Sequence, residues 1–329
     1  MRSFLPALRG ALGIGLLIGV ITSHAQTNPT ARSIPFTEAF PTSAFSTNPS
    51  GFQGWSGVNG NTTTTQALAE ASAPSANQAL SAAAATSGGT AGLYGNLRSA
   101  GNGYVIVNTS SNATIGACQL MMAINATNRM NVTVGYGVYS AFANPRTVGV
   151  VCQYRVGTSG AWTSISPDSG SNPYSQAGGT TGLKTTVSAT LPAACNYQAV
   201  VQIRWAIWRG TETGNSSALG FDDVTVGGTL DTDHDGDPDS TDPCPLVANV
   251  APGQGCDDGN ANTSNDVITA GCVCVGTVSN DECGNAGYLP LYDYADCPAN
   301  ATNGSTSGAT LTGTPGCNNS AVDVWYYVN

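Results

Sequence analysis

The stretch MNVTVGYGV, residues 130–138, shows the pattern that decides the fold. Apolar residues recur at every second position from Val132 to Val138, so in an extended chain their side chains all lie on one face. The stretch VGVVCQYRV, residues 148–156, alternates in the same way. Alternation over this length predicts strands that bury one face.

Further strand-like stretches lie at residues 103–107, 118–124 and 199–208, and clusters of Gly, Ser, Asn and Pro separate them. In the last stretch, Trp205 shares its face with apolar residues, so we expect it in the core. Only 9% of the residues are charged, and small polar residues are abundant. We therefore predict an all-β chain with few helices, whose largest part is an antiparallel two-sheet sandwich.

Short motifs mark both ends of this region. They are Phe36-x-Glu38-x-Phe40, Gly54-Trp55, Ile203-Arg204-Trp205 and Phe221-Asp222-Asp223-Val224. Together they resemble the jelly-roll modules of secreted Bacteroidetes proteins, which are related to MAM and concanavalin-like domains. The resemblance covers residues 34–228 and implies a jelly-roll sandwich whose first and last strands lie side by side.

The sequence DTDHDGDPDSTD, residues 231–242, has the spacing of a calcium loop. Aspartates occupy positions 1, 3, 5, 7, 9 and 12, and glycine occupies position 6, as in loops that bind calcium through hard oxygen ligands. With Cys244 following, the pattern resembles a thrombospondin type 3 repeat, which also implies bound calcium. A solvated acidic linker is the alternative. The predicted ligands are Asp231, Asp233, Asp235, Asp237, Asp239 and Asp242.

A second calcium site is predicted inside the jelly roll. If the first and last strands are neighbours, Glu38 lies close to Asp222 or Asp223, and these carboxylates could share an ion. The alternative needs no ion, because Asp223 could cap a turn while Glu38 is solvated.

The sequence also offers a candidate ligand patch. Arg204 and Trp208 lie on the opposite face of their strand from Trp205, and Trp162 could join them. Aromatic rings on rigid strands stack on sugar faces, so this patch could bind a glycan. Ordinary packing is the alternative.

The ten cysteines predict disulfides, because the chain is expected in an oxidising compartment and lacks histidine partners for zinc. Cys244, Cys256, Cys272 and Cys274 form a central group that allows three pairings, and the sequence does not choose among them. The last group, Cys283, Cys297 and Cys317, has an odd number. The odd number and an aromatic C-terminal strand predict a truncated chain.

The N-terminus resembles a secretory signal peptide. Arg2 and Arg9 precede or flank an apolar run at residues 11–21, and Ser23-His24-Ala25 gives a small-x-small cleavage site. We therefore predict an exported protein, located outside the cell or at its surface, with no membrane insertion. The formal net charge of −10 and the scarcity of lysine argue against nucleic acid as a partner.

Catalysis is not expected. Beyond the signal peptide the only histidine is His234, inside the aspartate loop, so histidine-based triads lack their base. We predict that His234 faces solvent and binds no metal. No zinc-protease, nucleophile-elbow or nucleotide-binding motif occurs either.

These observations divide the chain into six parts. They are the signal peptide (1–25), a polar leader (26–33), the jelly roll (34–228), the calcium loop (229–246), a cysteine-containing segment that resembles a repeat of exported Flavobacteria-type proteins (247–279), and a truncated second β-sandwich (280–329). The predicted function is a non-enzymatic, calcium-binding adhesion protein whose partners are calcium and glycans or cell-surface proteins, with calcium stiffening the spacer. The alternative is an accessory part of a larger secreted hydrolase.

Overall fold

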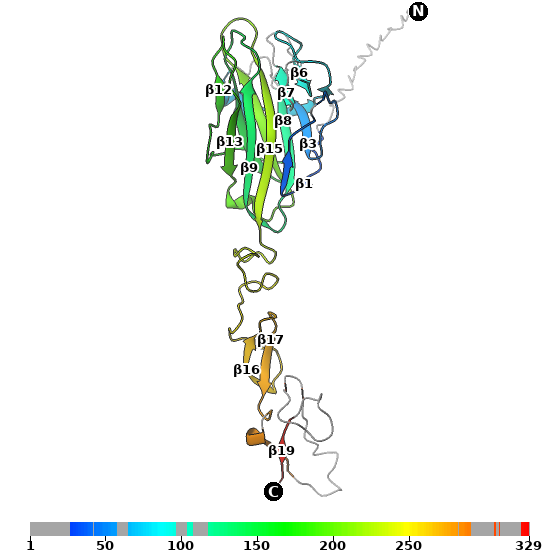
Figure 1. Cartoon of the computed structure of the whole chain (residues 1–329), viewed down its shortest axis with the longest axis vertical. Helices are drawn as coiled ribbons and strands as arrows, with labels where there is room; N and C mark the ends of the chain where they lie inside the picture. The colour runs from blue at the N-terminus through cyan, green and yellow to red at the C-terminus, as the bar shows by residue number, and fades with distance from the viewer. Residues whose placement is uncertain are drawn as a thin grey trace, which may run out of the picture.

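The computed structural model describes residues 27–41, 43–57, 65–96, 104–107, 118–281, 283–290, 306, 309 and 324–328. The predicted signal peptide, Cys297, Cys317 and most of the predicted second β-sandwich lie outside these residues. The described part is nearly all strand, and it is elongated, with a sandwich at one end and a small hairpin beyond a loop (Figure 1).

The described residues between 32 and 230 form two sheets. Sheet A has the order β11 (Thr163–Ser164), β10 (Val148–Val156), β14 (Val201–Arg209), β8 (Cys118–Asn125), β3 (Phe52–Gly57), β4 (Pro74–Asn77), with β1 (Arg32–Ser33) on β8 and β12 (Tyr174–Gln176) on β10. Sheet B has the order β13 (Thr185–Thr190), β9 (Arg129–Ser140), β15 (Ala218–Leu230), β7 (Tyr104–Val107), β6 (Gly92–Tyr94), β5 (Leu80–Ser81), with β2 (Phe36–Glu38) on β15. Neighbours are antiparallel except β1 with β8 and β5 with β6. The predicted fold class is confirmed, and β2 and β15 lie side by side as the resemblance implied.

The core lies between the two sheets. On β9, every second residue from Val132 to Val138 is buried, as the alternation predicts. Trp205 is fully buried and contacts Tyr136 edge to face, with ring centroids 5.4 Å apart. Burial of these large side chains sets which face of each strand points inward.

One short helix, α1 (Gln66–Ala71), covers part of the outer face of sheet A. Its N-cap Thr65 accepts a hydrogen bond from Leu68 N, and Ala69 packs on Val151 and Ala206. Two 3-10 turns, η2 (Ala193–Cys195) and η3 (Cys283–Asn285), complete the described helical structure. Within the described residues, no helix has the length and apolar character that crossing a bilayer requires.

Two cysteines of the sandwich correct the disulfide prediction. Cys152 and Cys195 are both free and fully buried. Cys152 points from β10 into the core, where it packs as a small apolar residue. Burial raises the pKa of both thiols, that of Cys195 to about 11. These two cysteines therefore contribute packing and not cross-links.

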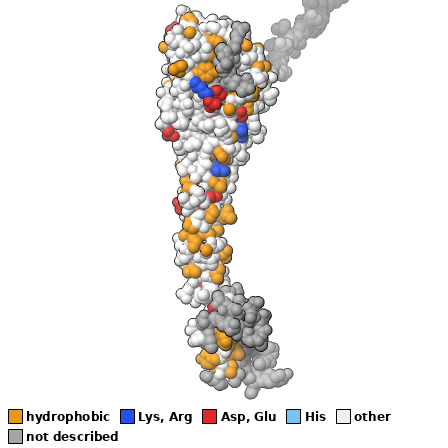
Figure 2. All heavy atoms as spheres, viewed as in Figure 1, with side chains coloured by type: hydrophobic (Ala, Val, Ile, Leu, Met, Phe, Trp, Pro, Cys, Tyr) orange, Lys and Arg blue, Asp and Glu red, His pale blue; other side chains and the backbone are white. Residues whose placement is uncertain are grey.

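Beyond the sandwich, cross-links replace a large core. The hairpin of β16 (Thr263–Ile268) and β17 (Cys274–Val278) is held by the Cys244–Cys272 and Cys256–Cys274 disulfides. This settles the pairing that the sequence left open. Figure 2 shows hydrophobic side chains on the surface of this narrow region, where Leu246 and Val273 are exposed. Further along, β18 (Gly287–Tyr288) and β19 (Tyr326–Tyr327) form a two-stranded parallel ladder.

Candidate functional site

The aspartate loop, residues 231–242, begins where β15 ends and is held at both ends. Asp231 N donates to the carbonyl of Asn128, 3.1 Å away, in the turn between β8 and β9. At the other end, Cys244 N donates to Asp242 Oδ1 (2.7 Å), and Cys244 is bonded to Cys272. The loop therefore connects the sandwich directly to the cross-linked hairpin.

Three of the six predicted ligands come together. One carboxylate oxygen each from Asp231, Asp233 and Asp235 lies within 4.8 Å of the other two. The loop backbone holds Asp231, because His234 N and Gly236 N donate to it at 2.8 and 3.1 Å. Gly236 has a φ of +99°, a conformation that favours glycine and lets the loop turn back on itself. The spacing of acids and glycine thus gathers a carboxylate triad.

The other three aspartates have different surroundings. Asp239 accepts hydrogen bonds from the backbone N and the hydroxyl of Thr232, both at 2.7 Å. Asp237 is exposed, and its backbone N donates to Asp235 at 2.8 Å. Asp242 lies close enough to the triad to affect the pKa of Asp233. Three carboxylates of the loop therefore lie together, and that of Asp242 lies next to them. Asp239 is hydrogen-bonded to Thr232, and Asp237 is exposed.

Negative charge in this loop is incompletely compensated. Burial, together with the charges of Asp235, Asp242 and Asp231, raises the pKa of Asp233 against the opposing backbone hydrogen bond from Asp235. Asp233 Oδ2 and Asp242 Oδ2 are buried atoms that accept no hydrogen bond from the described residues. Two such oxygens beside a carboxylate triad form a local excess of negative charge.

Asp231 behaves in the opposite way. It is fully buried, and burial acts to raise its pKa, but hydrogen bonds from Tyr197, Gly236 and His234 outweigh burial and lower the pKa. The Tyr197 hydroxyl donates to Asp231 Oδ2. Sequence reasoning missed this contact because Tyr197 lies 34 residues away and carries no motif. His234 is exposed, as predicted, yet its ring stacks on Tyr197 with centroids 4.3 Å apart.

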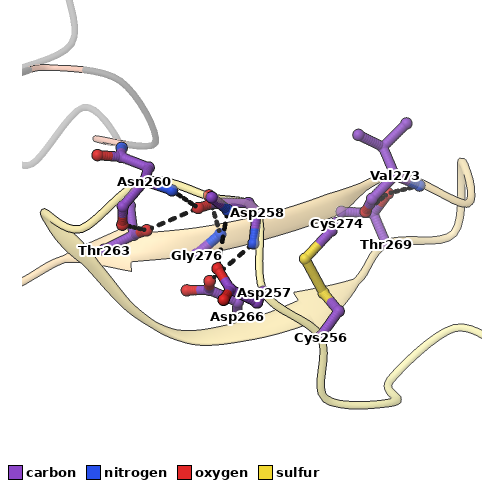
Figure 3. The surroundings of a disulfide bond; sticks show 11 residues. Cys256, Asp257, Asp258, Asn260, Thr263, Asp266, Thr269, Val273, Cys274 and Gly276 are labelled. Atoms are coloured by element: carbon purple, nitrogen blue, oxygen red, sulfur yellow. Dashed lines mark hydrogen bonds between the residues drawn. A yellow bond between two sulfur atoms is a disulfide. The ribbon is translucent and has the colours of Figure 1, made fainter.

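A second acidic cluster lies in the hairpin, beside the Cys256–Cys274 disulfide (Figure 3). Oxygens of Asp257, Asp258 and Asp266 lie within 4.8 Å of one another. Backbone groups hold the cluster together, because Asp258 N donates to Asp266 Oδ2 (3.0 Å) and Gly276 N donates to Asp258 Oδ2 (3.2 Å). No site was predicted here, and Asp266 lies eight residues beyond Asp258.

At the predicted second calcium site, arginine and lysine side chains of the protein pair with the carboxylates. Glu38 and Val224 are direct neighbours across β2 and β15, but the Glu38 carboxylate bonds Arg32 at 2.9 Å. Lys184 lies 2.8 Å from Asp222 and also bonds Asp223. Among the described residues, these three carboxylates do not form a cluster of the kind that gathers in the loop. The two strands are therefore adjacent, and among the described residues these carboxylates pair with Arg32 and Lys184.

The predicted ligand patch is wrong in one respect, because Arg204 is not exposed. Its guanidinium is fully buried and donates to Gln153 (2.6 and 2.9 Å) and to the carbonyls of Glu70 and Ser72 (2.8 and 2.6 Å). The side chain of Arg204 lies on the outer face of sheet A, as alternation predicts. Helix α1 and the residues that follow the helix cover this face. Trp208 packs over Gly149, where an added Cβ would lie 2.3 Å from the indole.

Trp162 remains partly accessible. It is half-buried, and the guanidinium carbons of Arg155 and Arg204 lie 4.3 and 4.4 Å from its ring centroid. Such cation–π contacts restrict the indole. Of the three predicted patch residues, Trp162 and Arg204 are thus in contact, with Trp162 as the outer member.

No protein family model and no curated protein matches this chain. Solved structures do. A carbohydrate-binding module, CBM4, is 18% identical over 44% of this chain and 79% of its own, with a TM-score of 0.26. CBM28, specific for non-crystalline cellulose, is 14% identical over 44% and 85%, with a TM-score of 0.28. The K3 adhesin domain of Lys-gingipain from Porphyromonas gingivalis is 10% identical over 40% and 79%, with a TM-score of 0.27.

Proposed function

We propose that this chain is an exported, non-catalytic binding protein of the cell surface, in which calcium stiffens the connection between a jelly-roll module and a disulfide-bonded hairpin. The observation that carries the proposal is the carboxylate triad of Asp231, Asp233 and Asp235, next to two buried oxygens that accept no hydrogen bond. Calcium would hold these groups together. Without it, their repulsion opposes the compact loop.

The ligand set fits a hard cation. All the gathered atoms are carboxylate oxygens, the donor type that calcium prefers, and no cysteine sulfur or imidazole belongs to the triad. Asp231, Asp233 and Asp235 would hold the ion, with Asp242 as the nearest further carboxylate. Because the loop joins the sandwich to the hairpin, an ion that orders the loop would also restrict how the hairpin is oriented relative to the sandwich.

Calorimetric titration of the full exported chain tests calcium binding. We expect a dissociation constant on the order of 0.1–1 mM, the range of extracellular calcium modules. At 10 mM calcium, mass action then stabilises the loop by about 1–3 kcal/mol. Asp235→Asn should weaken binding about tenfold or more, because a charged ligand becomes neutral.

The matched control is Asp168→Asn, which makes the same charge change at an exposed turn of the sandwich. Its calcium affinity should equal that of the wild type. A wild-type chain that releases no heat and keeps its melting temperature at 10 mM calcium would rule out the calcium role.

Glycan binding is the second candidate function, and Trp162 is the residue that favours it. Its indole is half-buried and is held by two arginines that lie over the ring, so a sugar would stack on ring surface that the arginines leave open. On a glycan array, the wild type should bind a saccharide and Trp162→Ala should lose that binding. Trp325→Ala, which removes an exposed indole far along the chain, is the control. Equal binding by Trp162→Ala and the wild type would exclude this platform, and no binding by the wild type would leave a protein surface as the partner class.

A further inference from the structure

The aspartate loop is joined to the sandwich by side chains, in addition to the peptide chain. The Tyr197 hydroxyl donates to Asp231 Oδ2, and the Tyr197 and His234 rings stack with centroids 4.3 Å apart. On the other side, His234 Nε2 lies 2.8 Å from Asn128 Oδ1, and Asn128 O accepts from Asp231 N. Two residues of the sandwich thus contact two residues of the loop.

The sandwich residues present a preformed surface. Tyr197 has a φ of +61° and Asn128 a φ of +57°, and both lie in turns at the same end of the sandwich. Tyr197 N donates to the carbonyl of Arg129 (2.9 Å), and this bond fixes the tyrosine next to the start of β9. The position of the phenol is therefore set by the sandwich and not by the loop.

Asp231 occupies a particular place in this arrangement. It is the first member of the carboxylate triad and is itself fully buried. Its Oδ2 atom takes the Tyr197 hydroxyl and Gly236 N, while Oδ1 takes His234 N. With three donors on one carboxylate, its orientation is fixed before any ion arrives, and preorganised ligands bind more tightly than mobile ones.

We infer that Tyr197 is a positioning residue for the calcium loop, and that through it calcium binding is coupled to the end of the sandwich. This inference rests on the proposed calcium function. Tyr197 touches no ion; it orients Asp231 and, by stacking on His234, holds the turn that carries Asp233 and Asp235. Coupling is reciprocal, so calcium should also stabilise the Tyr197 contact.

Tyr197→Phe in the full chain tests the inference, because it removes one hydroxyl and retains the stacked ring. Calorimetry should show calcium affinity about three- to tenfold weaker than in the wild type, which is part of the effect of one hydrogen bond to a charged group, because Asp231 keeps its two backbone donors. Tyr94→Phe is the control, since it removes a comparable hydroxyl bond, to Thr90 O at 2.7 Å, far from the loop.

A spectroscopic readout separates positioning from general stability. In chains with ¹³C at the tyrosine ζ carbon, the Tyr197 signal is identified by its absence in Tyr197→Phe. Calcium should shift that signal with the midpoint seen by calorimetry, while the Tyr94 signal stays in place. If Tyr197→Phe does not fold, the wild-type spectrum and His234→Asn, which removes the stacked ring and tolerates the positive φ, provide the test.

The two proposals fail in different ways. A wild-type chain that binds no calcium overturns the calcium function itself. A wild-type chain that binds calcium, with an unmoved Tyr197 signal and unchanged affinity in the folded variants, overturns the role of Tyr197 and leaves the calcium function standing.

Discussion

Asp231 and Asp233 are two positions apart in one loop, yet their surroundings differ. Asp231 is buried with three hydrogen-bond donors, which lower its pKa against the effect of burial. Asp233 has a buried oxygen without a donor, and burial and neighbouring charges raise its pKa. At the scale of residues, the ionised side chain of the first aspartate is therefore favoured by its surroundings, whereas that of the second is disfavoured.

Asp233→Asn should stabilise the chain when calcium is absent. A carboxyl whose pKa is raised by folding binds protons more readily in the folded state, so its contribution to stability falls as pH rises above 3.8, the ordinary value for this group. Asparagine does not titrate. In EDTA, thermal melts should give a higher melting temperature for the variant at pH 7, and this advantage should disappear below about pH 4.

Asp231→Asn is the informative comparison. Its lowered pKa means that the ionised side chain contributes stability above the ordinary pKa, and that this stability is lost as pH falls through the lowered value. This variant should therefore be less stable at pH 7, in contrast to Asp233→Asn. Two variants that destabilise equally would show that the carboxylates of the empty loop do not repel one another measurably.

At the scale of elements, long strands and short cross-linked segments are stabilised by different means. β9 and β15 pair along most of their length and bury large side chains between the sheets. The β16–β17 hairpin has few buried apolar residues, and the Cys244–Cys272 and Cys256–Cys274 bonds restrict its unfolded state instead. The loop thus lies between a packed element and a cross-linked one.

At the scale of the whole molecule, the loop determines how the sandwich and the hairpin are oriented (Figure 1). The sandwich end is attached through Tyr197 and Asn128, and the hairpin end through the Cys244–Cys272 disulfide. Under the proposed calcium function, repulsion among the carboxylates would loosen this connection, and a bound cation would tighten it.

Small-angle X-ray scattering in calcium and in EDTA measures this effect. We expect calcium to narrow the range of shapes, because a filled loop allows fewer orientations of the hairpin. Asp233→Asn should give the same profile in both conditions, since it removes a ligand. If the wild type binds calcium by calorimetry but scatters identically with and without it, the loop is already stiff and calcium has another role.

Local patterns were sufficient for much of the fold. Alternation along residues 130–138 and 148–156 correctly predicted two strands and the inward face of the first, because a period of two is a property of the extended backbone itself. On β10 the outer face is buried as well, since α1 packs on Val151, and Val156 at the end of the predicted inner face is exposed. The buried place of Trp205 followed from the same rule. Of the six aspartates that the spacing predicts as ligands, Asp231, Asp233 and Asp235 come together, and their binding of an ion stays a prediction.

Long-range contacts could not be predicted in this way. Alternation placed Arg204 on the outer face of its strand, but only the folded chain shows that α1 and the chain after it cover that face. Likewise, Arg32 and Lys184 pair with the carboxylates expected to share a second ion, and Cys152 is buried and free. Each outcome depends on residues distant in sequence.

The sequence by itself therefore determined the all-β class, the inward faces of the strands and the position of the acidic loop, because these follow from spacing between near neighbours. Only the tertiary structure decided which cysteines pair, which polar face is covered, and that Tyr197 holds Asp231. The physical reason is that burial, ion pairing and hydrogen bonding depend on which distant segments meet in space, and no local period contains that information.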